Sequence, residues 1–165
     1  MKFVAFTGHR PPKIGGYDDK HPLRVQIQQE IRFVLRGLQQ ENPELTAIVG
    51  GALGVDTDSA RECYKLGIPF IVAVPCRNQD KKWRVDAQVK YKKMLELAQE
   101  VVYVHDGDYT DSCMQERNRY MVDRADFLVA VWNGGKSGGT WNCLSYADTV
   151  KTGLTVYLID PKNPR

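Results

Sequence analysis

The chain has 165 residues, of which 42% are hydrophobic and 26% are charged, so it has the means to bury a core and is not an intrinsically disordered polypeptide. This length predicts one domain over residues 1–165. The 23 basic and 20 acidic side chains nearly cancel, leaving a net charge of +3. That balance argues against a nucleic-acid binder that depends on bulk charge, so we do not expect nucleic acid as a partner.

No segment has the pattern of a membrane span or a signal peptide. The longest apolar run, Phe70–Val74, is too short to cross a bilayer, and the apolar start Met1–Phe6 is too short to direct secretion. No two cysteines form a C-x-x-C pair, so no zinc ribbon is expected, and they are interpreted as reduced thiols. We therefore expect a cytoplasmic protein that has no membrane partner, holds no metal and requires no cofactor. The cysteines are Cys63, Cys76, Cys113 and Cys143.

Short β-rich runs alternate with helical patterns along the whole chain. The runs are continuously apolar, as expected when helices cover both faces of a parallel sheet. The alternation predicts an α/β fold with one doubly wound, mostly parallel sheet of about six strands flanked by helices. In chain order we expect a strand at Phe3–Thr7, a helix around Ile27–Leu38, a strand at Ala47–Val49, a helix at Asp56–Leu66, a strand at Pro69–Val74, a helix at Lys82–Ala98, a strand at Val101–Val104, a helix at Ser112–Asp123, a strand at Phe127–Val131, a helix at Trp141–Lys151 and a strand at Thr155–Ile159.

Ligands of such sheets bind beyond the carboxyl ends of the strands. The first strand is followed by Thr7-Gly8-His9-Arg10, where the glycine permits a tight turn and the arginine suits a phosphate or carboxylate. The next stretch, Lys13–His21, has no periodic pattern and is interpreted as a loop that could act as a lid. A plain surface loop with a solvated Arg10 is the alternative.

The second strand is followed by a glycine-rich turn, Gly50–Asp56, that leads into a helix. Its glycines free backbone N–H groups to face an anion, and the helix start adds partial positive charge. The spacing differs from the dinucleotide fingerprint G-x-G-x-x-G. Asp56 is expected to be the N-cap or a first-turn acid of this helix, and a hydrogen bond to a ribose hydroxyl remains an open alternative.

The fifth strand is followed by a second glycine-rich stretch, Asn133–Thr140, ahead of another helix. Its Gly-Lys-Ser triplet is not a P-loop, because Ala130 stands where a Walker A motif needs glycine, so Lys136 is expected to be solvated. Arg117 and Asn118 lie early in the fourth helix, near the same sheet edge.

The topology places these segments at one edge of the sheet, where a ligand with phosphates and ribose would fit. The expected ligand-binding residues are Thr7, Gly8, His9, Arg10, Gly50, Gly51, Ala52, Gly54, Val55, Asp56, Arg117, Asn118, Asn133, Gly134, Gly138, Gly139 and Thr140.

The sequence resembles the SLOG superfamily, the Rossmann-like group that joins the DNA-processing protein DprA to LOG-type cytokinin-activating enzymes, and within it the YpsA-like branch. The resemblance implies a nucleotide-derived ligand related to NAD or ADP-ribose, and a homo-oligomer such as a dimer or tetramer. The matching pieces are Thr7–Arg10, Gly50–Asp56, Pro75-Cys76 with Gln79 and Trp83, Arg117-Asn118 with Met121–Asp123, and Trp132–Gly134 with Gly138–Thr140.

One position departs from the LOG-type hydrolases, which carry a catalytic Glu in a Gly-Gly-x-Gly-Thr-x-x-Glu motif. Cys143 occupies the place of that Glu here, and a thiol is a poor substitute for a carboxylate that stabilises an oxocarbenium-like centre. No catalytic residue is assigned, and Glu116 and Asp56 are weak candidates. The chain is therefore interpreted as a binder rather than an enzyme.

Three functions are weighed. The first is a sensor or sequestering sponge for a signalling nucleotide of the ADP-ribose, cyclic ADP-ribose or NAD type, with Trp83, Trp132 or Trp141 available to stack on a base. The second is a nucleoside-phosphate N-glycosidase with Arg117 on the phosphate. The third is DprA-like binding of single-stranded DNA by basic residues around the third helix, which also read as a solvated helix face. Those residues are Lys81, Lys82, Arg84, Lys90, Lys92 and Lys93.

Overall fold

A computed structural model describes residues 1–150 and 153–162 of the chain. Within these residues six strands form one sheet in the order β4-β3-β2-β1-β5-β6, and every neighbouring pair is parallel. The expected α/β fold with a parallel sheet is confirmed. The strands are β1 (Phe3–Gly8), β2 (Thr46–Val49), β3 (Phe70–Val74), β4 (Glu100–Tyr103), β5 (Phe127–Val131) and β6 (Thr155–Ile159).

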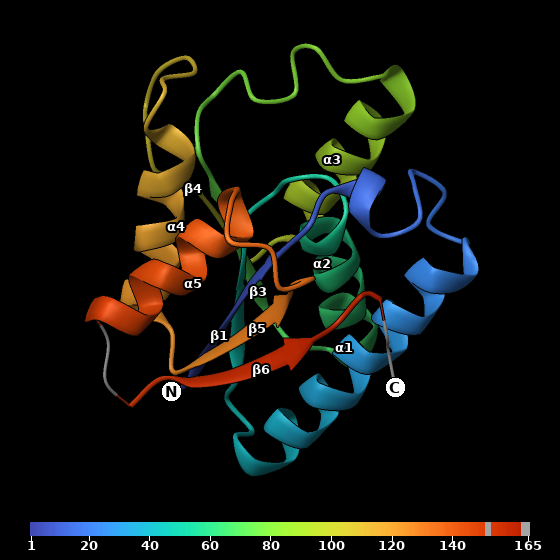
Figure 1. The fold of residues 1–165 in the computed structure, drawn as a ribbon, viewed down its shortest axis with the longest axis vertical. Coiled ribbons are helices and arrows are strands. Elements are labelled where there is room, and N and C mark those ends of the chain that lie inside the picture. The colour runs from blue at the N-terminus through green and yellow to red at the C-terminus, as the bar shows by residue number, and fades with distance from the viewer. Residues whose placement is uncertain (151–152, 163–165) are drawn as a thin grey trace.

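Five helices cover the two faces of the sheet. Figure 1 shows α1, α2 and α3 on one side and α4 and α5 on the other. Right-handed crossovers explain this division, because the chain moves outward from β1 to β4 and then returns to build β5 and β6 in the opposite direction. The expected helix end at Lys151 lies outside the described residues. The helices are α1 (Pro22–Glu41), α2 (Val55–Leu66), α3 (Val85–Leu97), α4 (Cys113–Arg124) and α5 (Gly139–Val150), with a short 3₁₀ turn at Pro11–Lys13.

Each face of the sheet has its own apolar core. Val4 and Phe6 of β1 point toward α1 and join its buried stripe, whereas Ala5 points to the other face and packs with residues of α4 and α5. Successive side chains of a strand alternate between faces, and both faces are buried here, which is why the strands read as continuous apolar runs. The buried stripe of α1 comprises Ile27, Ile31, Leu35 and Leu38.

Local signals explain where two helices begin and end. Pro22 opens α1, and the preceding His21 accepts the Leu23 N–H at Nδ1 (3.2 Å). Gly67 ends α2 in the left-handed conformation, with φ of 70°, at the stop expected from the sequence. None of the helices in residues 1–150 and 153–162 combines the length and apolarity needed to cross a membrane.

Strand β1 lies between β2 and β5, so the direction of winding reverses beside it. In doubly wound sheets this switch point leaves a crevice at the carboxyl ends of the strands, where ligands bind. The fold therefore brings the segments after β1, β2 and β5 to a single edge, as the sequence predicted.

Candidate functional site

A cavity of about 450 Å³ lies at the carboxyl end of β1, between the starts of α2, α4 and α5. We call it the switch-point cavity. Its size suits a small-molecule ligand. Ten of the expected site residues line it: Thr7, Gly8, His9, Arg10, Ala52, Asp56, Arg117, Asn118, Gly139 and Thr140. The remaining lining residues were not among the expected ones, but each lies within a few residues of an expected one in the chain. They are Phe6, Pro12, Lys13, Met114 and Asn142.

His9 connects the ends of β1 and β5. Its Nε2 accepts a 3.0 Å hydrogen bond from the backbone N–H of Asn133, and the residue is 7% exposed. Burial is the main cause that lowers the pKa of His9, the nearby Lys13 charge lowers it further, and the Asn133 side chain acts in the opposite sense. The imidazole is therefore neutral at neutral pH, and it holds two loops together rather than presenting a positive charge.

Two of the expected residues support the loop after β1 instead of facing the cavity. A Cβ at Gly54 would lie 2.8 Å from the carbonyl oxygen of His9, and Gly54 has φ of 94°. The Val55 side chain fills the space beside Gly8, where an added Cβ would be 2.5 Å from it. Glycine is thus needed at positions 8 and 54 for the start of α2 to approach β1.

The glycine turn after β2 is filled by a group of the protein itself. Asp56 is buried, and its Oδ2 accepts the N–H of Ala52 at 3.2 Å; the Gly50 N–H also bonds this carboxylate. Burial raises the pKa of Asp56, and the nearby Arg117 and the two N–H bonds act against that rise. Hence the Asp56 carboxylate takes the N–H groups of this turn that were expected to face the phosphate of a ligand. Gly50 and Gly51 do not line the cavity.

Arg117 lines the cavity, and its guanidinium is hydrogen-bonded to other groups of the protein. Its guanidinium donates to the Gly50 carbonyl and, through Nε, to the Asn118 side-chain oxygen (3.2 Å). A Cβ on Gly50 would collide with Arg117 and with Asp56, so the glycine here makes room for these two side chains. Arg117 is 8% exposed. Its positive charge balances the negative charge of the Asp56 carboxylate. Because its guanidinium already bonds protein groups, it has few donors left for a ligand.

The turn before α5 keeps its backbone donors available. Gly139 and Thr140 are the first residues of α5, and the first N–H groups of a helix have no partner within it. Gly138 adopts φ of 90°, which orients the turn. Asn118 steadies this end of the helix by donating to the Gly139 carbonyl (3.4 Å). The first turn of α5 is therefore the part of the cavity whose geometry best suits an anion.

The rest of the glycine-rich loop after β5 lies outside the cavity. Gly134, Lys136 and Gly138 are exposed and do not line it. Trp132 stacks on Trp141 with ring centroids 5.7 Å apart, and its indole N–H donates to the Gly135 carbonyl at 2.8 Å. The stacking of these two rings packs the loop against α5.

Neither the candidate acid Glu116 nor the Cys143 thiol, which stands at the hydrolase position, is placed to act as a catalytic group. Glu116 is exposed, accepts a bond from the Ser112 hydroxyl (3.1 Å) and does not line the cavity. Cys143 is 2% exposed, and burial raises its pKa to about 11, although the Thr7 hydroxyl bonds it. Among the described residues no group of three or more His, Cys, Asp or Glu side chains is arranged to hold a metal.

Together these features define a Rossmann-like α/β protein with a cavity at its topological switch point. Residues 4–163 match the family model YpsA, described as the YspA SLOG family, and the chain belongs to that family. This membership supports a nucleotide-related ligand in general terms. The SLOG resemblance found from the sequence motifs is confirmed.

Several known proteins are similar to this chain. It is 33% identical over 159 residues to the SPbeta prophage-derived protein YoqJ of Bacillus subtilis strain 168, covering 86% of this chain and 92% of YoqJ. Among solved structures, DprA of Streptococcus pneumoniae has a TM-score of 0.66 at 16% identity, and the match covers 96% of this chain but 50% of DprA. DNA processing protein A of Helicobacter pylori has a TM-score of 0.65 at 20% identity, with 94% and 64% covered. The chain thus spans half to two thirds of these two structures.

The expectation that nucleic acid is not a partner is wrong. It was based on a net charge of +3. The Helicobacter pylori protein, which shares this fold, is described in a single-stranded DNA binding mode. Net charge over a whole chain does not report how cations are distributed on one face, so near-neutrality does not exclude nucleic acid.

Proposed function

We propose that the protein binds a nucleotide-derived ligand of the ADP-ribose, cyclic ADP-ribose or NAD type in the switch-point cavity, as a sensor or a sequestering protein. One observation carries the proposal: two cations, Arg10 and Lys13, line the same cavity as the first turn of α5. Helix-start N–H groups and cations together suit a phosphate. The side chains of Thr140, Asn118 and Asn142 add hydrogen-bonding groups for ribose hydroxyls.

Calorimetric titration with ADP-ribose, cyclic ADP-ribose, NAD and AMP tests this proposal. Arg10→Gln and Lys13→Gln are each expected to weaken binding about tenfold, because a hydrogen bond to a charged group is removed. Lys136→Gln is the matched control, since this exposed lysine lies outside the cavity. Failure of all four compounds to bind would show that the proposal is wrong.

Binding is favoured over N-glycosidic hydrolysis by the placement of the acids. Glu116 is outside the cavity, and the Asp56 carboxylate is committed to the turn after β2. Neither is free to protonate a leaving base, a step that needs a positioned acid. Chromatography of nucleotides incubated with the protein distinguishes the two functions: intact nucleotides support binding, and release of free base would establish the hydrolase instead.

A second candidate function is binding of single-stranded DNA, favoured by the cations around α3. The six basic residues from Lys81 to Lys93 are all exposed. Such a surface suits a phosphate backbone, and its affinity should fall steeply with salt. Gel retardation of an oligothymidylate at low and high salt tests this function. The double variant Lys81→Gln, Lys92→Gln should weaken retardation, and equal retardation of the variant and the parent protein would rule this surface out.

A further inference from the structure

A second cavity, of about 490 Å³, lies on the other side of the loop that follows β1. We call it the α2–α3 cavity, because residues of these two helices supply most of its wall. Its floor is apolar and includes Ala60, Phe70 and Met94, all nearly fully buried, with Trp83 beside them. Trp83 is held edge-on against Tyr91 with ring centroids 5.2 Å apart. An apolar or aromatic group of a ligand would bury its surface here.

Charged side chains surround this apolar floor, and the cations outnumber the acids. The lining includes six basic residues, Arg24, Arg61, Lys82, Arg84, Lys90 and Lys93, against the acids Asp19, Asp58 and Asp86. Arg24 and Asp58 form a buried pair with each other, at 3.0 and 2.8 Å. The excess positive charge is therefore carried by side chains at the mouth, which complements an anion.

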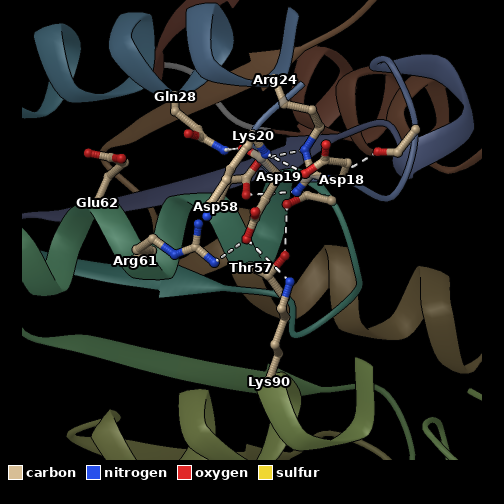
Figure 2. Close-up of polar contacts among 12 residues, drawn as sticks. Asp18, Asp19, Lys20, Arg24, Gln28, Thr57, Asp58, Arg61, Glu62 and Lys90 are labelled. Atoms are coloured by element: carbon tan, nitrogen blue, oxygen red, sulfur yellow. Dashed lines mark hydrogen bonds and ion pairs between the residues drawn. The ribbon is translucent and has the colours of Figure 1, made fainter. Parts of the chain in front are cut away.

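Two of these cations converge on one carboxylate from different helices. Arg61 of α2 and Lys90 of α3 bind the same oxygen of Asp19, at 2.8 and 3.3 Å, as Figure 2 shows. Partial burial raises the pKa of Asp19, but Arg61 and Lys90 together outweigh it and keep the pKa below its ordinary value. The two helices thus hold a site for a single anionic group, which the loop residue Asp19 fills.

The Asp19 backbone is held in place independently of its carboxylate. Its carbonyl oxygen accepts a 3.0 Å bond from Gln28, and Arg24 anchors the loop further by donating to the Gly16 carbonyl at 3.0 Å. Rotation about χ1 alone would move the carboxylate away from Arg61 and Lys90. The Arg61 and Lys90 side chains are 39% and 53% exposed and that of Asp19 is 17% exposed. An incoming anion would make the same two contacts, so it would displace the carboxylate at small cost.

We propose that the α2–α3 cavity binds a small organic anion with an apolar or aromatic body, whose anionic group replaces the Asp19 carboxylate between Arg61 and Lys90. The class comprises aromatic or aliphatic carboxylates, sulfonates and phosphate monoesters. This site is separate from the switch-point cavity and does not depend on the function proposed for it.

The probe for the test is 1-anilinonaphthalene-8-sulfonate, which joins an aromatic body to a sulfonate and fluoresces when it leaves water. Its uncharged relative N-phenyl-1-naphthylamine measures the apolar contribution alone. The two dyes are titrated into the full chain and into four variants. Asp19→Asn removes the internal competitor, Arg61→Gln and Lys90→Gln each remove one cation, and Asp18→Asn is the control. Asp18 is an exposed neighbour whose carboxylate accepts the Lys20 N–H, so its substitution changes the net charge equally.

Asp19→Asn should tighten binding of the sulfonate dye roughly twofold to fivefold, and Arg61→Gln or Lys90→Gln should weaken it by a similar factor, as expected for ion pairs that solvent partly screens. Asp18→Asn should behave as the parent protein, and the uncharged dye should bind all variants alike. Thermal melting verifies that each variant is folded, and either cation variant suffices if the other does not fold. Unchanged affinity in Asp19→Asn, or parallel changes for the uncharged dye, would overturn the proposal.

Discussion

His9 and Asn133, which are 124 residues apart in the chain, are joined by a 3.0 Å hydrogen bond from the Asn133 backbone N–H to the imidazole Nε2. The bond fixes the loop after β1 to the loop after β5 beside the switch-point cavity. Only the neutral imidazole accepts it, since both ring nitrogens of a protonated histidine are donors.

The stability of the protein should consequently depend on the protonation of His9. The pKa of His9 in the folded chain lies below its ordinary value of 6.5 because of burial and the Lys13 charge. The unfolded chain then binds more protons between these two pKa values, so the contribution is complete above pH 6.5 and is lost as pH falls through the folded pKa. Urea unfolding at pH 7.5 and 5.5 measures it. His9→Gln keeps an acceptor without titrating and should flatten the difference, and an undiminished difference would assign it to other groups.

The contact between Gly8 and Val55 predicts a cost for any side chain at position 8. A Cβ there would approach the Val55 Cγ2 to 2.5 Å, and Val55 is buried. Gly8→Ala should lower the free energy of unfolding by about 1–3 kcal/mol, the usual range for overpacking. Gly37 is the control: it is exposed in α1 with no atom near its Cβ position, and Gly37→Ala should stabilise by about 0.5–1 kcal/mol. Equal effects of the two substitutions in urea unfolding would contradict the packing argument.

The buried pair of Arg24 and Asp58 should be costly to break on one side. Their side chains are 4% and 1% exposed. Asp58→Ala leaves an uncompensated buried cation and should cost about 3–5 kcal/mol, whereas the double variant Arg24→Met, Asp58→Leu should cost less than the single one. Glu96→Ala removes an exposed partner of Lys93 and should cost under about 1 kcal/mol. Urea unfolding of the three variants measures the order of their free energies of unfolding. A double variant less stable than Asp58→Ala would contradict the interpretation.

The cysteines should be unreactive in the folded chain. All four are buried, and burial raises the pKa of both Cys76 and Cys143 to about 11 and also raises that of Cys63. The thiolate is the reactive form, so Ellman's reagent at pH 8 should label the native protein more than about 100-fold more slowly than a free thiol. Absorbance of the released chromophore, with and without urea, measures this. Rapid labelling of Cys63, Cys76 or Cys143 before unfolding would contradict the raised pKa of that thiol.

Much of the fold was predictable because it rests on local pattern. The alternation of apolar runs with helical periodicity identified every strand and α-helix of the described residues, to within a few residues except at the start of α1, but not the 3₁₀ turn at Pro11–Lys13. The parallel order then placed Thr7–Arg10 and Gly139–Thr140 at one sheet edge, where both line the switch-point cavity. Glycine at the end of α2 was equally clear, because only a left-handed residue stops a helix in that way.

The sequence by itself thus determined the α/β fold, the family and the edge of the sheet that carries the candidate site. Tertiary structure alone decided which groups fill the space there. Asp19 lies between Arg61 and Lys90, contacts that span 42 and 71 residues, and Arg117 takes the Gly50 carbonyl across 67 residues. Such pairings follow from how helices dock on the sheet and how burial changes the cost of a charge, and no local sequence pattern encodes either.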